Sequence, residues 1–543
     1  MEEKYIDIPQ EKFEFANMGD RITDKKFDTK PIGYFKDAFI RFCKNKASVV
    51  AAIIIGIIIL YALLVPLFAS DKRETLLDVN YLKKGPRSTL VKEITNNQLM
   101  NGGTKKDLVQ NSLIYEIAKG VDAENGIRGE TISLAESMES KYSPINKIYK
   151  SYTALRGTVE ATYYTTNLDA YVGVGFVFLQ IPQDEYKRIQ EYEEATGLKI
   201  LYPLIDEESD YYFSTDPTNA ANYWYKAVTD RCKKSVQKNY GMLTPVLTGE
   251  DGKPVYVTEY DENLVLEDNY LRDDQGNVRY WRYIGGGNAD TAEYKVRVLY
   301  YNYYIYKNGF EPNYLFGTDS QGYDLAVRMA SGLRLSLMLS VVVSFINFII
   351  GALYGAVEGY YGGIIDLALE RVSDILNGVP FIIVATLFQM HLAQKVGAIP
   401  SLIFAFVLTG WIGTAYRVRA QFYRFKNQEY VMAARTLGAS DNRIIWKHIF
   451  PNTLGTIITS SVLVIPGTIF SESMLSFLGI VNLGGSKTTS LGTLLSDASS
   501  IWTMYPHLMI FPATVISLLM ICFNLFGNGL RDAFNPTLRG ADE

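Results

Sequence analysis

The side chains that most often do chemistry in enzymes are few in this sequence and widely separated. The three histidines, His391, His448 and His507, lie in different segments, so they do not form the closely spaced pair that holds zinc. The three cysteines are scattered and form no redox or metal motif. The stretch GGSKTT at 484–489 resembles a phosphate-binding loop only superficially, because no predicted strand precedes it. We therefore expect that the chain is not an enzyme and binds no cofactor or metal of its own.

A different kind of site is indicated by the charged stretch YVMAARTLGASDNRIIWKHIFPN at 430–452. Long apolar runs flank it on both sides, so it is too charged to lie in lipid and too apolar for a simple loop. Tyr430, Ala434 and Leu437 are spaced to share one helical face. Gly438 allows a backbone conformation that would end this helix. We expect two short helices hinged at Gly438.

The second short helix is predicted to begin at Ser440 or Asp441, either of which can act as its N-cap. We expect Pro451 to end this helix. Its apolar side chains are predicted to form an exposed edge, which needs a partner. The alternative is a loop that only lies on the membrane surface. The apolar residues of this second helix are Ile444, Ile445 and Ile449.

The sequence contains six long apolar runs, and the charged loop lies between the fourth and the fifth. A hydrocarbon core about 30 Å thick needs about 20 apolar residues per helix, and none of the runs contains Asp, Glu, Lys or Arg. We expect an α-helical polytopic membrane protein with six transmembrane helices, the first at 47–69 and the others within 316–527. The first run is too long, and begins too far into the chain, for a cleavable signal peptide. The runs are Ala47–Ala69, Leu335–Val357, Ile375–Ala393, Ile399–Tyr416, Thr453–Phe470 and Leu508–Phe526.

Lysine and arginine near the ends of the runs predict the orientation, because cytoplasmic loops carry an excess of both. The segment before the first run and the segment between the fourth and fifth runs are rich in them. With six spans, both lie on one side only if the N-terminus is cytoplasmic. We therefore predict cytoplasmic tails at 1–46 and 528–543 and a cytoplasmic loop at 428–452. Residues 31–46 are predicted to form either an amphipathic helix on the inner membrane surface or a polar helix leading into the first span.

A long segment, 70–315, lies between the first and second runs, and the predicted orientation puts it outside the cytoplasmic membrane. It holds most of the chain's 39 tyrosines and is large enough to bury its own core. Its single cysteine, Cys232, cannot form an internal disulfide. Alternating patterns and turn signals predict an inserted α+β domain. Helices are expected at 104–122 and 183–198, and strands at 170–182, 253–268 and 293–306.

The spacing of Ala433, Ala434, Gly438 and Pro451 resembles the E-A-A-x-x-x-G signature of bacterial ABC-importer permeases. The stretch AARTLGAS…RIIWKHIFPN is similar to the C-type subunit of the oligopeptide and dipeptide permease branch. Other stretches resemble this branch in the same order along the chain. They are FGTDSQGYDLAVRMASGLRLSL at 316–337, GYYGGIIDLALERVSDILNGVP at 359–380, ESMLSFLGI at 472–480 and GNGLRDAFNPTLR at 527–539.

The resemblance implies that 430–452 forms coupling helices that dock on cytoplasmic ATPase subunits. Met432 replaces the glutamate of the family signature, so a charged contact is either absent or supplied by Glu429, three residues earlier. The ATPase-coupling residues that the resemblance implies are Glu429, Met432, Ala433, Ala434, Gly438, Ile445, His448, Pro451 and Asn452.

The other matching stretches imply structural roles. Asp319 and Asp324 are expected to order the entry to the second span through turn hydrogen bonds. Glu472 is expected to cap SMLSFLGI as a short helix, and the alternative is that it contacts substrate. The signature residues with implied structural roles are Gly317, Thr318, Asp319, Gly322, Asp324, Glu472, Arg531 and Asp532.

The function implied is that of the membrane-spanning permease subunit of an ATP-binding-cassette importer for oligopeptides or dipeptides. Its partners would be a homologous B-type permease subunit, two cytoplasmic ATPase subunits that use ATP and Mg, and an extracytoplasmic substrate-binding protein. One alternative is another cargo, such as a nickel chelate, haem, glutathione or a sugar. Another is an ion-driven secondary transporter, which would need ionisable groups at mid-membrane. The inserted domain is longer than the loop typical of the branch, and its tyrosines predict either a docking surface or a tyrosine-rich core.

Overall fold

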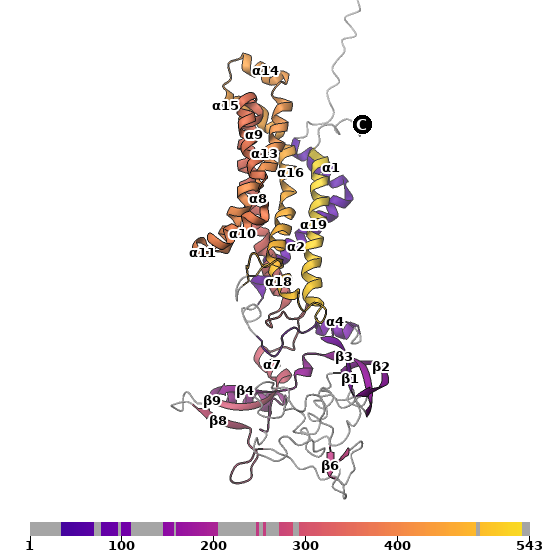
Figure 1. The fold of residues 1–543 in the computed structure, drawn as a ribbon. Helices are drawn as coiled ribbons and strands as arrows, with labels where there is room; N and C mark the ends of the chain where they lie inside the picture. Colours follow the sequence, from indigo (N-terminus) through magenta and orange to yellow (C-terminus); the bar gives the residue numbers. More distant parts are fainter. Residues whose placement is uncertain are drawn as a thin grey trace, which may run out of the picture.

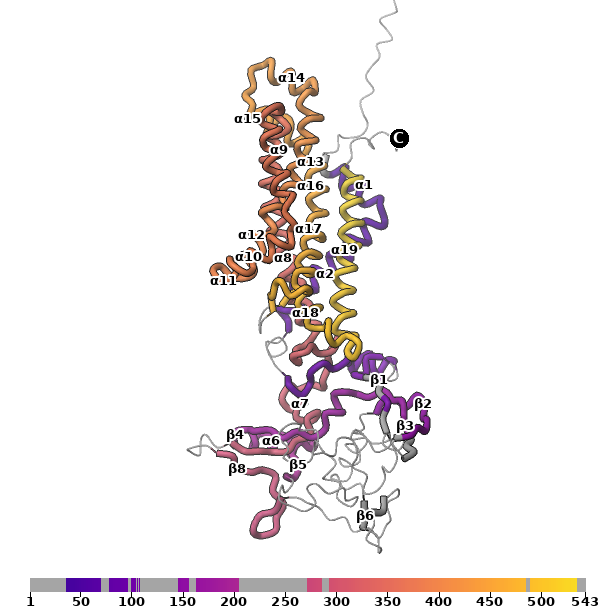
Figure 2. Tube along the Cα trace, in the orientation of Figure 1, coloured from indigo at the N-terminus to yellow at the C-terminus, as the bar shows by residue number. Residues whose placement is uncertain are grey.

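The computed structural model describes residues 34–69, 78–95, 99–109, 145–156, 159–204, 246–248, 254–256, 271–285, 293–484 and 489–534. In Figure 1 a bundle of long helices occupies one end of the molecule and the strands lie at the other end. The short helix α14 (Glu429–Thr436) lies at the tip of the bundle that is farthest from the strands. The tube in Figure 2 follows the same arrangement, with the C-terminal helix (His507–Phe534) beside the helix Tyr34–Lys44.

The bundle contains helices that precede the strand region in the sequence and helices that follow it. The first apolar run forms α2 (Lys46–Phe68) and the second forms the longer α8 (Leu325–Tyr361). The remaining elements of the bundle are α1 (Tyr34–Lys44), α9 (Gly363–Asn377), α10 (Phe381–His391), α11 (Ala393–Val396), α12 (Ala398–Gly410), α13 (Ile412–Phe425), α14, α15 (Asp441–Arg443), a π-helical segment (Ile444–Ile449), α16 (Phe450–Val462), α17 (Val464–Phe477), α18 (Leu491–Ala498) and α19 (His507–Phe534).

Five helical stretches of the described residues are long and apolar enough to cross a membrane. The predicted third span, Ile375–Ala393, is not one straight helix. Its residues belong to α9 and α10, which are bent by 72° at a short break. Pro380 lies in this break and lacks the backbone N–H that a continuous helix needs. The bent pair would be a sixth span only if it crosses as one unit. The five stretches are Lys46–Phe68, Leu325–Tyr361, Ala398–Phe425, Asp441–Phe477 and His507–Phe534.

Helix α1 confirms the helix predicted near residues 31–46. One side of it packs on the C-terminal helix, where the rings of Phe42 and Phe526 meet edge to face at 5.4 Å. Phe39, on another side, is 67% exposed. The helix therefore joins the bundle through part of its apolar surface and leaves the rest free.

Helices α8 and α13 pack closely because small residues line their contact. A Cβ added at Gly355 would lie 2.2 Å from the carbonyl oxygen of Ala415. A Cβ added at Gly359 would lie 2.5 Å from Cβ of Phe422. Both positions leave no room for a larger side chain, so the two helices are in backbone contact over several turns.

The strand region contains two larger antiparallel sheets. In the first, β1 (Gly103–Val109), β3 (Val159–Asp169) and β2 (Ile145–Arg156) follow the order β1-β3-β2. In the second, β9 (Glu293–Leu299) pairs with β4 (Phe176–Pro182) along one edge. Its other edge pairs with β5 (Leu201–Tyr202) and β8 (Trp281–Gly285). The other elements are α4 (Thr89–Ile94), a 3-10 turn (Val172–Val174), α6 (Gln183–Thr196), β6 (Val246–Thr248), β7 (Pro254–Tyr256) and α7 (Tyr300–Asn308).

The predicted elements of this region meet different outcomes. The helix expected at 183–198 is confirmed as α6, and the strand expected at 170–182 is confirmed as β4, which begins only at Phe176. The helix expected at 104–122 is wrong where the structure describes it, because Gly103–Val109 is a strand paired along its whole length with β3. The rest of that prediction, and most of the strand expected at 253–268, lies outside the described residues.

The strand expected at 293–306 ends at Leu299, where helix α7 begins. Tyr300, Tyr303 and Tyr304 are buried and lie three and four residues apart, which is the spacing of one helical face. The tyrosine content favours a strand, but a helix buries these three tyrosines on one face, and the segment is helical.

These tyrosines form a core. The ring of Tyr81 lies 5.0 Å from the rings of both Tyr171 and Tyr300 and 5.3 Å from that of Tyr304. Tyr171 in turn stacks on Tyr314 at 5.5 Å. Since the rings pack against one another inside the domain, this cluster favours the tyrosine-rich core over a docking surface.

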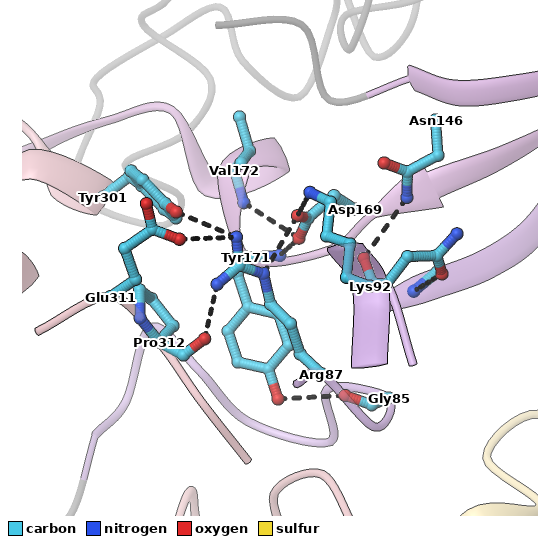
Figure 3. A network of polar contacts seen from close by, with 12 residues as sticks. Gly85, Arg87, Lys92, Asn146, Asp169, Tyr171, Val172, Tyr301, Glu311 and Pro312 are labelled. Carbon is cyan, nitrogen blue, oxygen red and sulfur yellow. Dashed lines mark hydrogen bonds and ion pairs between the residues drawn. The ribbon is translucent and has the colours of Figure 1, made fainter. Parts of the chain in front are cut away.

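Arg87 ties together the chain segments that enter and leave the strand region (Figure 3). The side chain is 2% exposed, and its Nε donates to Asp169 Oδ2 at 3.1 Å. Its Nη2 donates to the Tyr301 hydroxyl at 2.8 Å and its Nη1 to the carbonyl oxygen of Pro312. Burial lowers the pKa of the guanidinium, but Asp169 and Tyr301 outweigh this effect and hold it above its ordinary value. The buried cation is therefore fully paired.

Candidate functional site

The predicted two-helix loop lies at the tip of the bundle, and Gly438 is its hinge. Helix α14 ends at Thr436, and Gly438 follows with a φ of +83°, a left-handed conformation that favours glycine. Among the described residues, no atom lies within 4 Å of a Cβ added at Gly438. The backbone conformation, and not a lack of space, therefore requires glycine at this position.

The inner face of the loop is anchored to the bundle. Val431, Ile444 and Ile449 are fully buried and belong to one apolar cluster with Ala356 of α8 and Phe422 of α13. Ile445 is buried in the same cluster. The prediction that the isoleucines form an exposed edge is therefore wrong. They hold the loop on the two closely packed helices beneath it.

The most exposed large apolar side chains of the loop are not the isoleucines but Leu437 and Met432. Leu437 is 87% exposed and Met432 is 54% exposed, and both lie on or just after α14. Ala434 and His448 are half-buried. The other predicted coupling residues that are exposed are Glu429, Ala433, Gly438, Pro451 and Asn452.

The prediction that Pro451 ends the second helix is wrong. Pro451 lies at the start of α16. The π-helical segment just before it has wider turns, and the Phe450 N–H donates to the Ile445 carbonyl oxygen five residues earlier. Such a wide turn accommodates a residue that has no N–H of its own. The Asn452 side chain donates to the His448 carbonyl oxygen at 2.7 Å and so continues the helix across the proline.

Polar contacts fix the angle between the loop and α8. The Tyr360 hydroxyl donates to Asp441 Oδ1 at 2.5 Å and accepts from Arg435 Nη2 at 3.4 Å. Ser440 occupies the N-cap position of the second helix but makes no side-chain capping bond. The carboxylate of Asp441 thus bonds to the bundle instead of capping its own helix.

An ion-pair network that the sequence does not predict joins α13 to α9 beneath the loop. Arg419 donates to both oxygens of Asp366, at 2.6 and 2.8 Å, and to Glu370 at 2.9 Å. The Tyr423 hydroxyl donates to Asp366 at 2.5 Å. The only signal in the sequence was the four-residue spacing of each pair, Asp366 with Glu370 and Arg419 with Tyr423.

At the opposite end of the bundle, Asp319 and Asp324 order the entry to α8, as predicted. Asp319 Oδ1 accepts from the backbone N–H groups of Gln321 and Tyr323, both at 2.9 Å. Asp324 Oδ1 accepts from the N–H of Ala326 at 2.9 Å and caps α8. Burial raises the pKa of the Asp319 carboxyl, although these hydrogen bonds act in the other direction.

The neighbouring signature residues bring the chain that follows the first span against this entry. Thr318 Oγ1 accepts from the N–H of Lys84 at 2.8 Å. Gly317 and Gly322 have φ values of +85° and +91°. A Cβ added at Gly322 would lie 2.3 Å from the carbonyl oxygen of Asp78. Residues 317–324 therefore hold the chain that follows the first span against the start of α8, and so connect the strand region to the bundle.

The prediction that Glu472 caps a short helix is wrong, because this residue lies inside α17. Its side chain is fully buried and accepts from the hydroxyls of Ser336, at 2.8 Å, and Ser476, at 3.0 Å. Glu472 therefore joins α17 to α8. Arg531 and Asp532 are exposed in the last turn of α19.

Two family models match the chain. Residues 348–540 match the binding-protein-dependent transport system inner membrane component, and residues 33–86 match the N-terminal TM domain of oligopeptide transport permease C. Residues 87–347, which include the strand region, lie between these two matches.

Several named relatives are similar over the same share of the chain. The oligopeptide transport system permease protein OppC of Bacillus subtilis is 40% identical over 225 residues, covering 41% of this chain and 72% of that protein. The dipeptide transport system permease protein DppC of Bacillus subtilis is 41% identical, covering 41% and 69%. OppC of Escherichia coli is 40% identical, covering 42% and 73%. The solved MetNI methionine ABC transporter aligns with a TM-score of 0.33 at 18% identity, covering 38% of this chain and 96% of that chain.

Proposed function

The chain belongs to the family of binding-protein-dependent transport system inner membrane components, in its oligopeptide and dipeptide permease branch, and we propose that it forms half of a peptide-import pore. It is a multi-pass membrane protein with several apolar helices. The names of its relatives favour oligopeptides or dipeptides as cargo over nickel chelates, haem, glutathione or sugars. ATP hydrolysis belongs to separate subunits of such transporters.

The loop at 428–452 carries this proposal. It combines an exposed apolar outer face, at Leu437 and Met432, with an inner face that is buried in the bundle. An exposed leucine on a firmly anchored helix pair is suited to dock in a groove of a partner protein. We assign that partner as the cytoplasmic ATPase subunit, as the family resemblance implies.

The anchoring of the loop suggests how movement would pass from the ATPase to the pore. A push on α14 would reach α8 and α13 through Val431 and Ile444, since these side chains belong to one buried apolar cluster with residues of both helices. It reaches α9 through the ion pairs of Arg419 with Asp366 and Glu370. Closure of two ATPase subunits around ATP would thus tilt α8, α9 and α13 together, which is alternating access driven from a distant site.

The complete transporter would contain a homologous B-type permease, two ATPase subunits that use ATP and Mg, and an extracytoplasmic substrate-binding protein. We place both termini and the loop at 428–452 on the cytoplasmic side of the inner membrane, and the strand region outside. The location of the loop and the strands at opposite ends of the molecule supports this assignment (Figure 1). Glu429, exposed in the first turn of α14, supplies the charged contact that Met432 lacks.

Cross-linking tests the assigned partner. In a chain whose own cysteines are replaced by serine, Leu437→Cys should form a cross-link with an amine of an ATPase subunit through a short reagent that joins a thiol to an amine. The matched control is Leu315→Cys. Leu315 is also an exposed leucine (45%), but it lies near the start of α8, at the opposite end of the bundle. A cross-link from position 315 and none from position 437 would reject the proposed docking.

A further inference from the structure

The strand region contains a cavity that is separate from the membrane bundle. It has a volume of about 320 Å³ and lies between α6 and the second sheet. This volume lies within the range of sites that bind small ligands. The lining residues that matter for its chemistry are Tyr186, Gln190, Glu193, Lys199, Leu201 and Tyr280.

The walls of the cavity are held in place by contacts of their own. Glu193 Oε1 accepts from the N–H groups of Ile200 and Leu201 at 2.5 and 2.7 Å, which ties the end of α6 to β5. Tyr186 is 8% exposed, and its ring meets that of Tyr294 edge to face at 5.8 Å. The cavity is therefore formed before any ligand arrives, which lowers the entropic cost of binding.

The lining offers charges of both signs together with aromatic rings. Lys199 supplies a cation and Glu193 an anion, while Tyr186 and Tyr280 supply aromatic surface. Burial raises the pKa of Tyr186 to about 12, and the neighbouring Glu193 adds to this effect, so the hydroxyl stays protonated at neutral pH. A ligand that matches this lining carries an ammonium group, a carboxylate and an apolar or aromatic part.

The cavity adjoins β8 (Trp281–Gly285), a strand that has one partner among the described strands. Tyr280 directly precedes β8, and among the described strands β8 pairs only with β9. Its side chains are exposed, with Trp281 at 41% and Tyr283 at 51%. The backbone groups on the far edge of such a strand can bond an extended peptide.

We propose that this cavity captures short peptides with free termini, and that longer peptides extend from it along β8. Lys199 pairs with the peptide carboxylate, Glu193 with the ammonium group, and the two tyrosines contact a side chain. The inference rests on the proposed function, from which it takes the cargo class. It gives the strand region the role of holding peptide on the transporter itself.

Calorimetric titration of the purified transporter, without the soluble binding protein, tests the site. We expect trialanine to bind, and Lys199→Gln and Glu193→Gln each to weaken its affinity at least fivefold. Glu193→Gln keeps an oxygen for the Ile200 and Leu201 amides, so the wall can still form. Trialanine that is acetylated and amidated at its ends should bind as weakly to the unchanged protein as trialanine binds to the variants.

The matched control is Lys187→Gln, which removes the same charge from an exposed position of α6 outside the cavity. It should leave trialanine affinity unchanged. Equal affinities of all variants, equal affinity for the blocked peptide, or no binding at all would overturn the capture site. Uptake by the unchanged transporter is measured in parallel. Uptake without an effect of the cavity variants rejects the capture site alone, whereas absence of any peptide uptake rejects the proposed function.

Discussion

Gly438 offers the sharpest single test of the hinge, because its surroundings separate backbone strain from steric conflict. Its φ is +83°, and no atom of the part of the chain that the structure describes lies within 4 Å of an added Cβ. A side chain therefore meets no neighbour, and the penalty is that of the left-handed backbone, about 1–2 kcal/mol for an ordinary residue. The penalty is larger for a β-branched residue and smaller for asparagine, which tolerates this conformation. At about 1.4 kcal/mol per factor of ten, alanine disfavours the native hinge roughly tenfold.

The expected order of coupled transport is therefore glycine, then Gly438→Asn, Gly438→Ala and Gly438→Val. The assay reconstitutes the complete transporter in proteoliposomes and measures peptide uptake and ATP hydrolysis in the same sample. We expect the amount of chain in the membrane to stay constant, because the buried side of the loop is untouched. Full uptake by Gly438→Val, or equal loss in Gly438→Asn and Gly438→Val, would refute the argument from backbone strain.

Three further outcomes are expected. Glu429→Gln should reduce retention of the ATPase subunits in a pull-down more than Met432→Leu does, and equal retention would remove the idea of compensation. A thiol reagent that does not cross membranes should label Cys232, which lies outside the described residues, in sealed cells, but not Ser440→Cys; labelling at position 440 would reverse the orientation. Arg87→Ala should destabilise the strand region by about 3–5 kcal/mol, because it removes the buried partner of Asp169 at 3.1 Å and leaves that carboxylate only the more exposed Lys92 at 3.7 Å. An unchanged urea midpoint, followed by tyrosine fluorescence, would contradict the last expectation.

The parts of the fold that the sequence predicted well are those with a local physical cause. The first apolar run predicts α2 almost to the residue, because a bilayer requires an unbroken run of apolar side chains. The hinge at Gly438 and the hydrogen-bonded entry to α8 at Asp319 and Asp324 follow from the conformational and hydrogen-bonding preferences of single residues. Each of these predictions needs only a short window of sequence.

The predictions that failed depend on contacts between distant segments. Glu472 resembles a capping residue from its neighbours, but Ser336 of another helix decides its role. The face of Ile444 was expected to meet a partner, but it is buried against α8 and α13, whose close approach a single helix pattern does not reveal. Pro451 is tolerated in a helix only because a wide π-type turn precedes it, which residue preferences do not predict.

Above all, we propose that ATP drives peptide import through a pore to which this chain contributes. Uptake of a labelled tripeptide into proteoliposomes containing the complete transporter tests it most directly. We predict uptake that requires ATP on the loop side of the membrane and is abolished when this chain is omitted. Uptake that proceeds on an ion gradient without ATP, or that is unchanged without this chain, would contradict the account.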